Sequence, residues 1–310
     1  MRIELNKFSL LILILSIFLI SCNGNDKSHE NKKLKVVATT TMITDLVKNI
    51  AGEKVELKGL MRAGVDPHLY KATEGDMNLF LNADLVFYNG LHLEGKLVEL
   101  FEKMSKRGSN LFAISDGIDK SMLISSSDFA NNYDPHIWFD IGIWKKAAEY
   151  VAKKLADVDN SNKDYYFSNL KTYLKELDSA ENVIKQKVNE LPKEQRILIT
   201  AHDAFNYFGR AYGFEVKGLQ GISTLSEASV FDVQNLANFI IEKNIKAVFV
   251  ETSVPMKNIE ALRQAVKSKG QEIKIGGELF SDSLGNTDRP EGTYIGMMIH
   301  NVNTIVNSLK

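Results

Sequence analysis

From Leu34 onward, short runs of apolar and β-branched residues alternate with longer stretches in which apolar residues recur every three or four positions. The short runs predict buried strands, and the longer stretches predict amphipathic helices that cover them. The expected strands are 35–38, 55–60, 83–88 and 110–114 in the first half, and 196–200, 214–217, 247–250 and 272–275 in the second. Short strands that alternate with helices of this length indicate βαβ units on parallel sheets.

The helices expected in these halves cover 43–50, 75–82, 93–106, 143–155, 230–243, 255–270 and 293–310. Between the halves, apolar residues keep a helical spacing through 161–191, without Gly or Pro until Pro192. At about 1.5 Å per residue this helix would be roughly 40 Å long, enough to pass along two lobes. The predicted fold class is therefore α/β, with two lobes (34–160 and 192–310) that carry parallel-type sheets and are joined by one long rigid helix.

The first 33 residues differ in character. Two cations and one acid precede an apolar run from Phe8 to Ile20, which is too short to span a bilayer as a helix and is typical of a secretory leader. The run ends in Leu19-Ile20-Ser21-Cys22, which resembles the lipobox of bacterial lipoproteins. That resemblance implies that residues 1–21 are a signal peptide and that Cys22 is lipidated. The alternative is an ordinary signal peptide followed by a chance cysteine.

Residues 22–33 lack large apolar side chains and predict a flexible tether, in which His29 is solvated. Two or more acyl chains on Cys22 would anchor the protein stably, so we expect it in the cell envelope, facing the periplasm or the exterior. Cys22 is the only cysteine, which excludes an intrachain disulfide and a thiolate metal site. The net charge of −1 gives no nucleic-acid signature.

The tripeptide Asp-Pro-His occurs twice, at 66–68 and at 134–136, although the chain has only five prolines and six histidines. Proline fixes the backbone before each imidazole, and the neighbouring carboxylate can accept a proton from a ring nitrogen, as commonly happens in metal sites. The pair therefore predicts half of a metal site formed by His68 and His136. The alternative is turn chemistry followed by a solvated histidine.

His202 and Asp282 also follow predicted strands. Ligands of open α/β sheets gather beyond the carboxyl ends of strands, so two facing lobes could bring all four side chains together. Three imidazoles and a carboxylate suit tetrahedral Zn²⁺, or Mn²⁺ if Asp282 binds through both oxygens. Taken singly, His202 could begin a helix and Asp282 could cap a turn.

Three other residues are weaker candidates. His92 could approach the site, but a position in a surface loop is favoured. His300 lies beside the apolar stripe of the last helix, which indicates a solvated side chain. Glu251 follows a strand, where a capping role or a contact to a metal ligand is favoured over direct ligation.

The motifs and their order resemble the metal-binding lipoproteins of ABC importers, the cluster A-I or zinc/manganese solute-binding family, nearest to its TroA-like members. The resemblance covers essentially residues 34–310. The motifs that carry it are Asp66-Pro67-His68-Leu69-Tyr70, the run from Ala83 to Glu94, Asp134-Pro135-His136-Ile137-Trp138, Ala201-His202-Asp203-Ala204-Phe205, Gly218-Leu219-Gln220-Gly221-Ile222-Ser223 and Leu279-Phe280-Ser281-Asp282.

The resemblance implies a monomeric solute-binding protein, not an enzyme, that holds a metal between two α/β lobes and delivers it to a membrane permease powered by an ATPase. It implies His68 and His136 as ligands from the amino lobe, and His202 and Asp282 from the carboxyl lobe. Many manganese- or iron-associated relatives have Glu where this chain has His202. Zinc-dedicated relatives often carry a His-rich loop before the second ligand, whereas 121–133 has no histidine. The three imidazoles favour Zn²⁺ as the transported ligand, with Mn²⁺ next.

Two other functions fit parts of the sequence. A secreted zinc-dependent hydrolase would also use three histidines, but it needs an open coordination position, and the chain has no His-Glu-x-x-His motif. An adhesin-like role in cell adhesion is sometimes attributed to such lipoproteins, but no residue of the chain supports it.

Overall fold

The amino half contains a four-stranded parallel sheet in the order β2-β1-β3-β4. The computed structural model describes residues 33–126 and 132–310; the predicted signal peptide, Cys22 and His29 lie outside these residues. The strands are β1 (Leu34–Ala38), β2 (Val55–Gly59), β3 (Leu85–Tyr88) and β4 (Leu111–Ala113). β2, β3 and β4 lie within the segments that the apolar pattern predicts, and β1 begins one residue earlier.

Four helices belong to this half: α2 (Thr41–Ala51), α3 (Glu74–Asn82), α4 (Val98–Lys106) and α5 (Ile141–Val158). Local sequence explains their starts. The Thr40 hydroxyl accepts a hydrogen bond from Ile43 N at the start of α2, and Thr73 and Asp76 form a capping box at the start of α3. Gly52, with a φ of 52°, ends α2 in a conformation that favours glycine.

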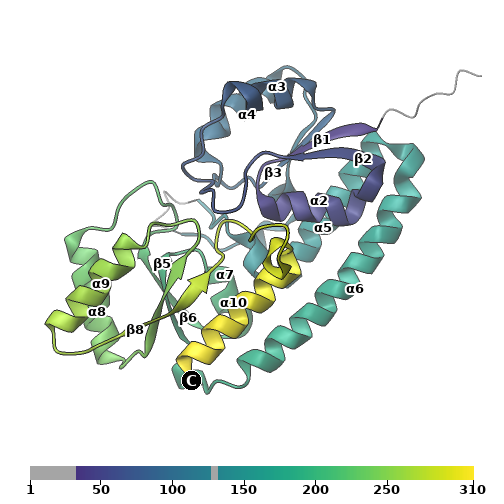
Figure 1. Cartoon of the computed structure of the whole chain (residues 1–310). Coiled ribbons are helices and arrows are strands. Elements are labelled where there is room, and N and C mark those ends of the chain that lie inside the picture. The colour runs from purple at the N-terminus through teal and green to yellow at the C-terminus, as the bar shows by residue number, and fades with distance from the viewer. Residues whose placement is uncertain (1–32, 127–131) are drawn as a thin grey trace, which may run out of the picture. The chain divides into compact units, whose positions relative to one another are not determined.

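The long predicted helix is α6 (Lys163–Val188), which contains 26 residues. Its buried stripe packs against α2, α5 and α10. Figure 1 shows α6 as the teal rod that runs beside α5 and α10. The prediction of an α/β fold with a long helix between two lobes is thus confirmed.

The carboxyl half contains two parallel strand pairs, β5 with β6 and β7 with β8, and β5 contacts β7. The strands are β5 (Ile197–His202), β6 (Glu215–Gln220), β7 (Ala247–Glu251) and β8 (Lys274–Leu279). The helices are α7 (Asn206–Tyr212), α8 (Val230–Glu242), α9 (Lys257–Ser268) and α10 (Tyr294–Leu309).

One hydrophobic core extends through both halves. It includes Val36 and Phe87 from the four-stranded sheet, Phe249 and Leu279 from the β7–β8 pair, and the buried faces of α5, α6 and α10. A second cluster lies under α8 and α9, and a third lies under α4 and part of α3. Because strands of both halves pack on the shared core, the carboxyl ends of these strands are held next to the same interior region.

The structure differs from the sequence prediction at several points. The helix expected at 93–106 begins only at Val98, because residues 90–92 have positive φ angles and a short 3₁₀ turn follows. The last strand was predicted to end at 275 but extends to Leu279, which pairs with Glu251. Helix α7 was not expected at all. In the described part of the chain, no helix combines the length and apolarity needed to cross a bilayer.

Candidate metal site

Four side chains from four separate segments meet at the carboxyl ends of the strands. His68 lies in the loop after β2, and His136 precedes the 3₁₀ turn Ile137–Phe139 that leads into α5. His202 is the last residue of β5, and Asp282 lies in the loop after β8. Each side chain is at most 1% exposed. The structure therefore brings together all four residues that the sequence singled out.

The donor atoms lie close enough to share one ion. The His68 Nε2 and His136 Nε2 atoms are 3.4 Å apart, and Asp282 oxygens lie 3.5 Å from His136 Nε2 and 3.3 Å from His202 Nε2. The longest of these contacts, between His68 Nε2 and Asp282 Oδ2, measures 4.0 Å. Taken together, one donor atom from each residue lies within 4.8 Å of the others.

These spacings fit a tetrahedral ion. Bonds of about 2.0 to 2.1 Å place tetrahedral ligand atoms about 3.3 to 3.4 Å apart, close to three of the four distances. Among the described residues, both Asp282 oxygens and His202 Nε2 are buried without a hydrogen-bond partner. Buried polar atoms normally have partners, so atoms that lack them and face one point indicate a binding site for a cation.

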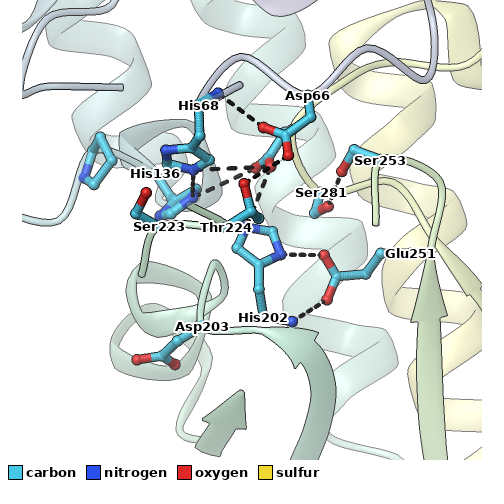
Figure 2. A network of polar contacts seen from close by, with 12 residues as sticks. Asp66, His68, His136, His202, Asp203, Ser223, Thr224, Glu251, Ser253 and Ser281 are labelled. Atoms are coloured by element: carbon cyan, nitrogen blue, oxygen red, sulfur yellow. Dashed lines mark hydrogen bonds and ion pairs between the residues drawn. The ribbon is translucent and has the colours of Figure 1, made fainter. Parts of the chain in front are cut away.

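Two of the three imidazoles are oriented by carboxylates. His136 Nδ1 donates to Asp134 Oδ1 over 2.7 Å. His202 Nδ1 donates to Glu251 Oε2 over 2.5 Å, as Figure 2 shows. Each bond fixes the tautomer in which Nε2 is free to bind a metal. Glu251 thus has the contact to a predicted ligand that was favoured for it. Its other oxygen accepts the backbone N–H of His202.

His68 is held differently, contrary to the expectation that each tripeptide orients its own ring. Asp66 Oδ1 accepts the backbone N–H of His68 at 2.8 Å, and Asp66 Oδ2 accepts the Thr224 hydroxyl at 2.6 Å (Figure 2). Among the described residues, His68 Nδ1 has no hydrogen-bond partner. Asp66 therefore fixes the loop backbone and ties it to the carboxyl half, but makes no hydrogen bond to the ring.

Burial and neighbouring charges shift the pKa values of the three imidazoles. Burial lowers the pKa of His68 to about 3. Burial acts in the same direction on His136, but the charge and hydrogen bond of Asp134, helped by Asp282, outweigh it and raise the pKa of His136 to about 9. For His202, the charges of Asp282 and Glu251 outweigh burial and raise the pKa well above its usual value.

Asp282 is the counter-charge of this group. Burial opposes its ionisation, but the neighbouring charges of His202 and His136 outweigh burial and hold the pKa of Asp282 well below its usual range. The cluster therefore has a carboxylate facing two protonated imidazoles near neutral pH. A divalent cation that binds there would displace those protons.

The Asp282 loop is also tied to the amino half. Trp138 Nε1 donates to Ser281 O at 3.0 Å, and the Thr41 hydroxyl accepts Leu284 N at 2.8 Å. The roles of Trp138, Thr41 and Thr224 in joining the two halves were not predicted from the sequence. No motif could have found them, because their partners lie more than 140 positions away along the chain.

The two remaining candidates lie elsewhere. His92 is exposed and does not belong to the four-residue group, as favoured for a surface residue. His300 is not fully solvated as expected: its Nε2 lies 3.1 Å from the Glu278 carbonyl and its ring packs against Phe280. The cause is β8, whose extension to Leu279 brings Glu278 beside α10.

Comparison with known proteins agrees with this geometry. The sequence model of the family described as "ZnuA: Zinc-uptake complex component A periplasmic" matches residues 36–308. The chain belongs to this family. It is 49% identical to the zinc-binding protein TroA of Treponema pallidum over 92% of each chain, and 41% identical to the manganese-binding lipoprotein MntA of Bacillus subtilis over 96% of this chain and 97% of MntA.

The fold agrees as well. The solved structure of the periplasmic zinc-binding protein TroA from Treponema pallidum superposes with a TM-score of 0.87, covering 89% of this chain and 99% of TroA. The ZnuA-family assignment confirms the resemblance to zinc/manganese solute-binding lipoproteins of ABC importers. Zinc and manganese both occur in the names of the relatives.

Proposed function

We propose that this protein captures one Zn²⁺ ion between His68, His136, His202 and Asp282 and delivers it to the permease of an ABC importer. The observation that carries the proposal is the convergence of these four buried donors, with both Asp282 oxygens lacking partners among the described residues. The relatives TroA and MntA, named as metal-binding proteins, support the same role.

Zinc fits the donor set better than manganese. Three imidazoles and one carboxylate match the ligands and the four-coordinate geometry that Zn²⁺ adopts in proteins. Mn²⁺ lies lowest in the divalent affinity series and favours oxygen donors, so it is the second choice, with Asp282 binding through both oxygens. Four protein donors complete a tetrahedral sphere, which leaves no position for a catalytic water and argues against a hydrolase.

The cellular setting follows from the sequence. Cleavage of residues 1–21 would expose Cys22 for lipidation, and residues 22–33 would tether the protein to the membrane on its extracytoplasmic side. Residues 34–160 and 192–310 would form two metal-binding lobes joined by a linking helix within 161–191. The protein would work as a monomer with the permease and its ATPase.

Calorimetric titration with Zn²⁺ tests the proposal. Replacing Asp282 by Ala should abolish high-affinity binding, because it removes the only anionic donor of the set. Asp288→Ala is the matched control, since Asp288 is exposed six positions further along the same loop. Unchanged Zn²⁺ affinity in a folded Asp282→Ala variant would refute the proposed site. Peptidase or esterase activity of the zinc-loaded protein would favour the hydrolase instead.

A further inference from the structure

The turn from Asn89 to Glu94 has a backbone that few sequences adopt. Gly90, Leu91 and His92 have consecutive φ angles of 82°, 53° and 63°. Side chains on L-residues disfavour this left-handed region, so Leu91 and His92 are strained. Gly90 is required for a second reason, because an added Cβ would lie 2.4 Å from the Ser115 hydroxyl. Strain of this kind persists only where surrounding contacts impose it.

Glu94 is the residue that imposes the turn. Its side chain is 2% exposed and accepts three hydrogen bonds. Oε1 accepts the Thr39 hydroxyl and the Asn89 N–H, both at 2.7 Å, and Oε2 accepts the Gly90 N–H at 3.3 Å. A buried carboxylate with several N–H and O–H donors is a strong acceptor, so it can hold the chain in a conformation that it would otherwise leave.

Asn89 connects this turn to the candidate metal site. Its side chain is 1% exposed, and Nδ2 donates to the carbonyl of Pro135 at 2.9 Å. Pro135 immediately precedes His136, whose own backbone N–H and ring N–H are both held by Asp134. Among the described residues, the carbonyl of Pro67 in the other tripeptide receives no such side-chain bond. The turn thus acts on one of the two tripeptides only.

We infer that Asn89 and Glu94 are positioning residues for His136: the Glu94 carboxylate fixes the left-handed turn, and the Asn89 amide fixes the backbone that carries the imidazole. This inference rests on the proposed function, because it takes His136 to be a metal ligand. Neither residue contacts the metal position. Their contribution is to keep His136 Nε2 at the distance from the other donors that a bound ion requires.

The test measures Zn²⁺ release in the presence of a chelating indicator, and the visible absorption of the Co²⁺-loaded protein, in wild type, Asn89→Ala and Glu94→Gln. Loss of a side chain that contacts a metal ligand commonly weakens metal binding by about 10- to 100-fold. We expect about tenfold faster release from both variants, because Asn89 and Glu94 act on His136 only through the backbone. The Co²⁺ spectrum should change as well, because it reports the ligand geometry and not the stability of the fold.

A second substitution separates positioning from general destabilisation. Glycine adopts the left-handed region at little cost, so His92→Gly should restore slow release in the Glu94→Gln background. It should not restore it in the Asn89→Ala background, where the link to Pro135 is missing. Glu99→Gln, at an exposed glutamate in the first turn of α4, is the matched control and should behave like wild type.

The outcomes are distinguishable from a failure of the proposed function. Wild-type release rates and Co²⁺ spectra in folded Asn89→Ala would overturn the inference, as would equal rescue of both backgrounds by His92→Gly. If Glu94→Gln fails to fold, Asn89→Ala and its His92→Gly double variant decide the question alone. Equal metal binding by wild type and His136→Ala would instead refute the proposed site.

Discussion

The two Asp-Pro-His tripeptides share a sequence but hold their histidines in different ways. Asp134 bonds both the ring and the backbone N–H of His136, whereas Asp66 bonds only the backbone of His68 and the Thr224 hydroxyl. His136 is also fixed through Asn89, and the Asp134 carbonyl accepts the Tyr207 hydroxyl of α7. One motif therefore holds the imidazole ring through its own aspartate, and the other holds only the backbone of its histidine.

This difference teaches that a repeated motif predicts which residues meet, but not what each does after they meet. We expect a bound ion to lose His68 first, because no carboxylate holds its ring as Asp134 and Glu251 hold the rings of His136 and His202. Such an order suits a protein that must both hold an ion and hand it on.

The largest expected effect comes from pH. Because the pKa of His136 is raised to about 9 and that of His68 is lowered to about 3, binding near neutral pH must displace a proton from His136 but none from His68. For each proton that Zn²⁺ displaces, the affinity rises about tenfold when the pH rises by one unit. The affinity for Zn²⁺ should therefore rise about 100-fold or more from about pH 6 to about pH 8. Calorimetry in buffers of different ionisation enthalpy measures the proton release; no release at about pH 7 would contradict the asymmetry.

The next largest effect should separate Asp134 from Asp66. Asp134→Asn removes the charge beside the His136 ring and also places an amide against the Asn206 amide, which now donates to Asp134 Oδ2. We expect a loss of Zn²⁺ affinity of about 10- to 100-fold. Asp66→Asn keeps an oxygen for the His68 N–H and should cost no more than about threefold. Competition with a chelating indicator measures both, and equal losses would show that the tripeptides act alike.

Glu251→Gln extends the comparison to the third imidazole. His202 resembles His136 in having its Nδ1 held by a carboxylate, so the loss of affinity should be about tenfold and closer to that of Asp134→Asn than to that of Asp66→Asn. Glu278→Gln, on the neighbouring strand β8, serves as the control. Competition with the chelating indicator measures this loss. Wild-type affinity in Glu251→Gln would show that a carboxylate is not needed to orient the imidazole.

A smaller effect than that of Asp134→Asn or Glu251→Gln is expected at Thr224. Thr224→Val deletes the hydroxyl that ties Asp66 to the carboxyl half. A hydrogen bond of this kind contributes about 1 kcal/mol, so Zn²⁺ should dissociate about fivefold faster. Thr224→Ser retains the hydroxyl and should release Zn²⁺ at the wild-type rate. Stopped-flow chelation distinguishes the two, and identical rates would show that this bond does not restrain the His68 loop.

Much of the fold follows from the sequence because apolar periodicity reports burial directly. Strand β3 is a continuous apolar run, β7 is one up to its last residue, and α6 has an uninterrupted helical spacing. Helix α7 escaped prediction because a seven-residue segment gives too few turns for a periodic signal. The delayed start of α4 escaped because the left-handed turn depends on Glu94, Thr39 and Ser115, which meet only in the folded chain.

The candidate site shows the same division. His68, His136, His202 and Asp282 could be named from their residue types and their places after strands or before helices, since parallel sheets gather strand ends. Glu251 could be suspected for the same reason. The Nδ1 partners could not be assigned, because Asp66 and Asp134 stand in identical Asp-Pro-His tripeptides. The contacts that distinguish these tripeptides come from distant residues, namely Thr224, Asn89 and Tyr207.

The central claim is that one divalent ion is coordinated by all four side chains. A crystal structure of the protein purified with Zn²⁺, with anomalous data collected at the zinc edge, tests it most directly. We expect a single ion about 2.0 to 2.2 Å from the Nε2 atoms of His68, His136 and His202 and from an Asp282 oxygen. An ion that lacks any of these four ligands, or that keeps a water molecule in place of one, would contradict it.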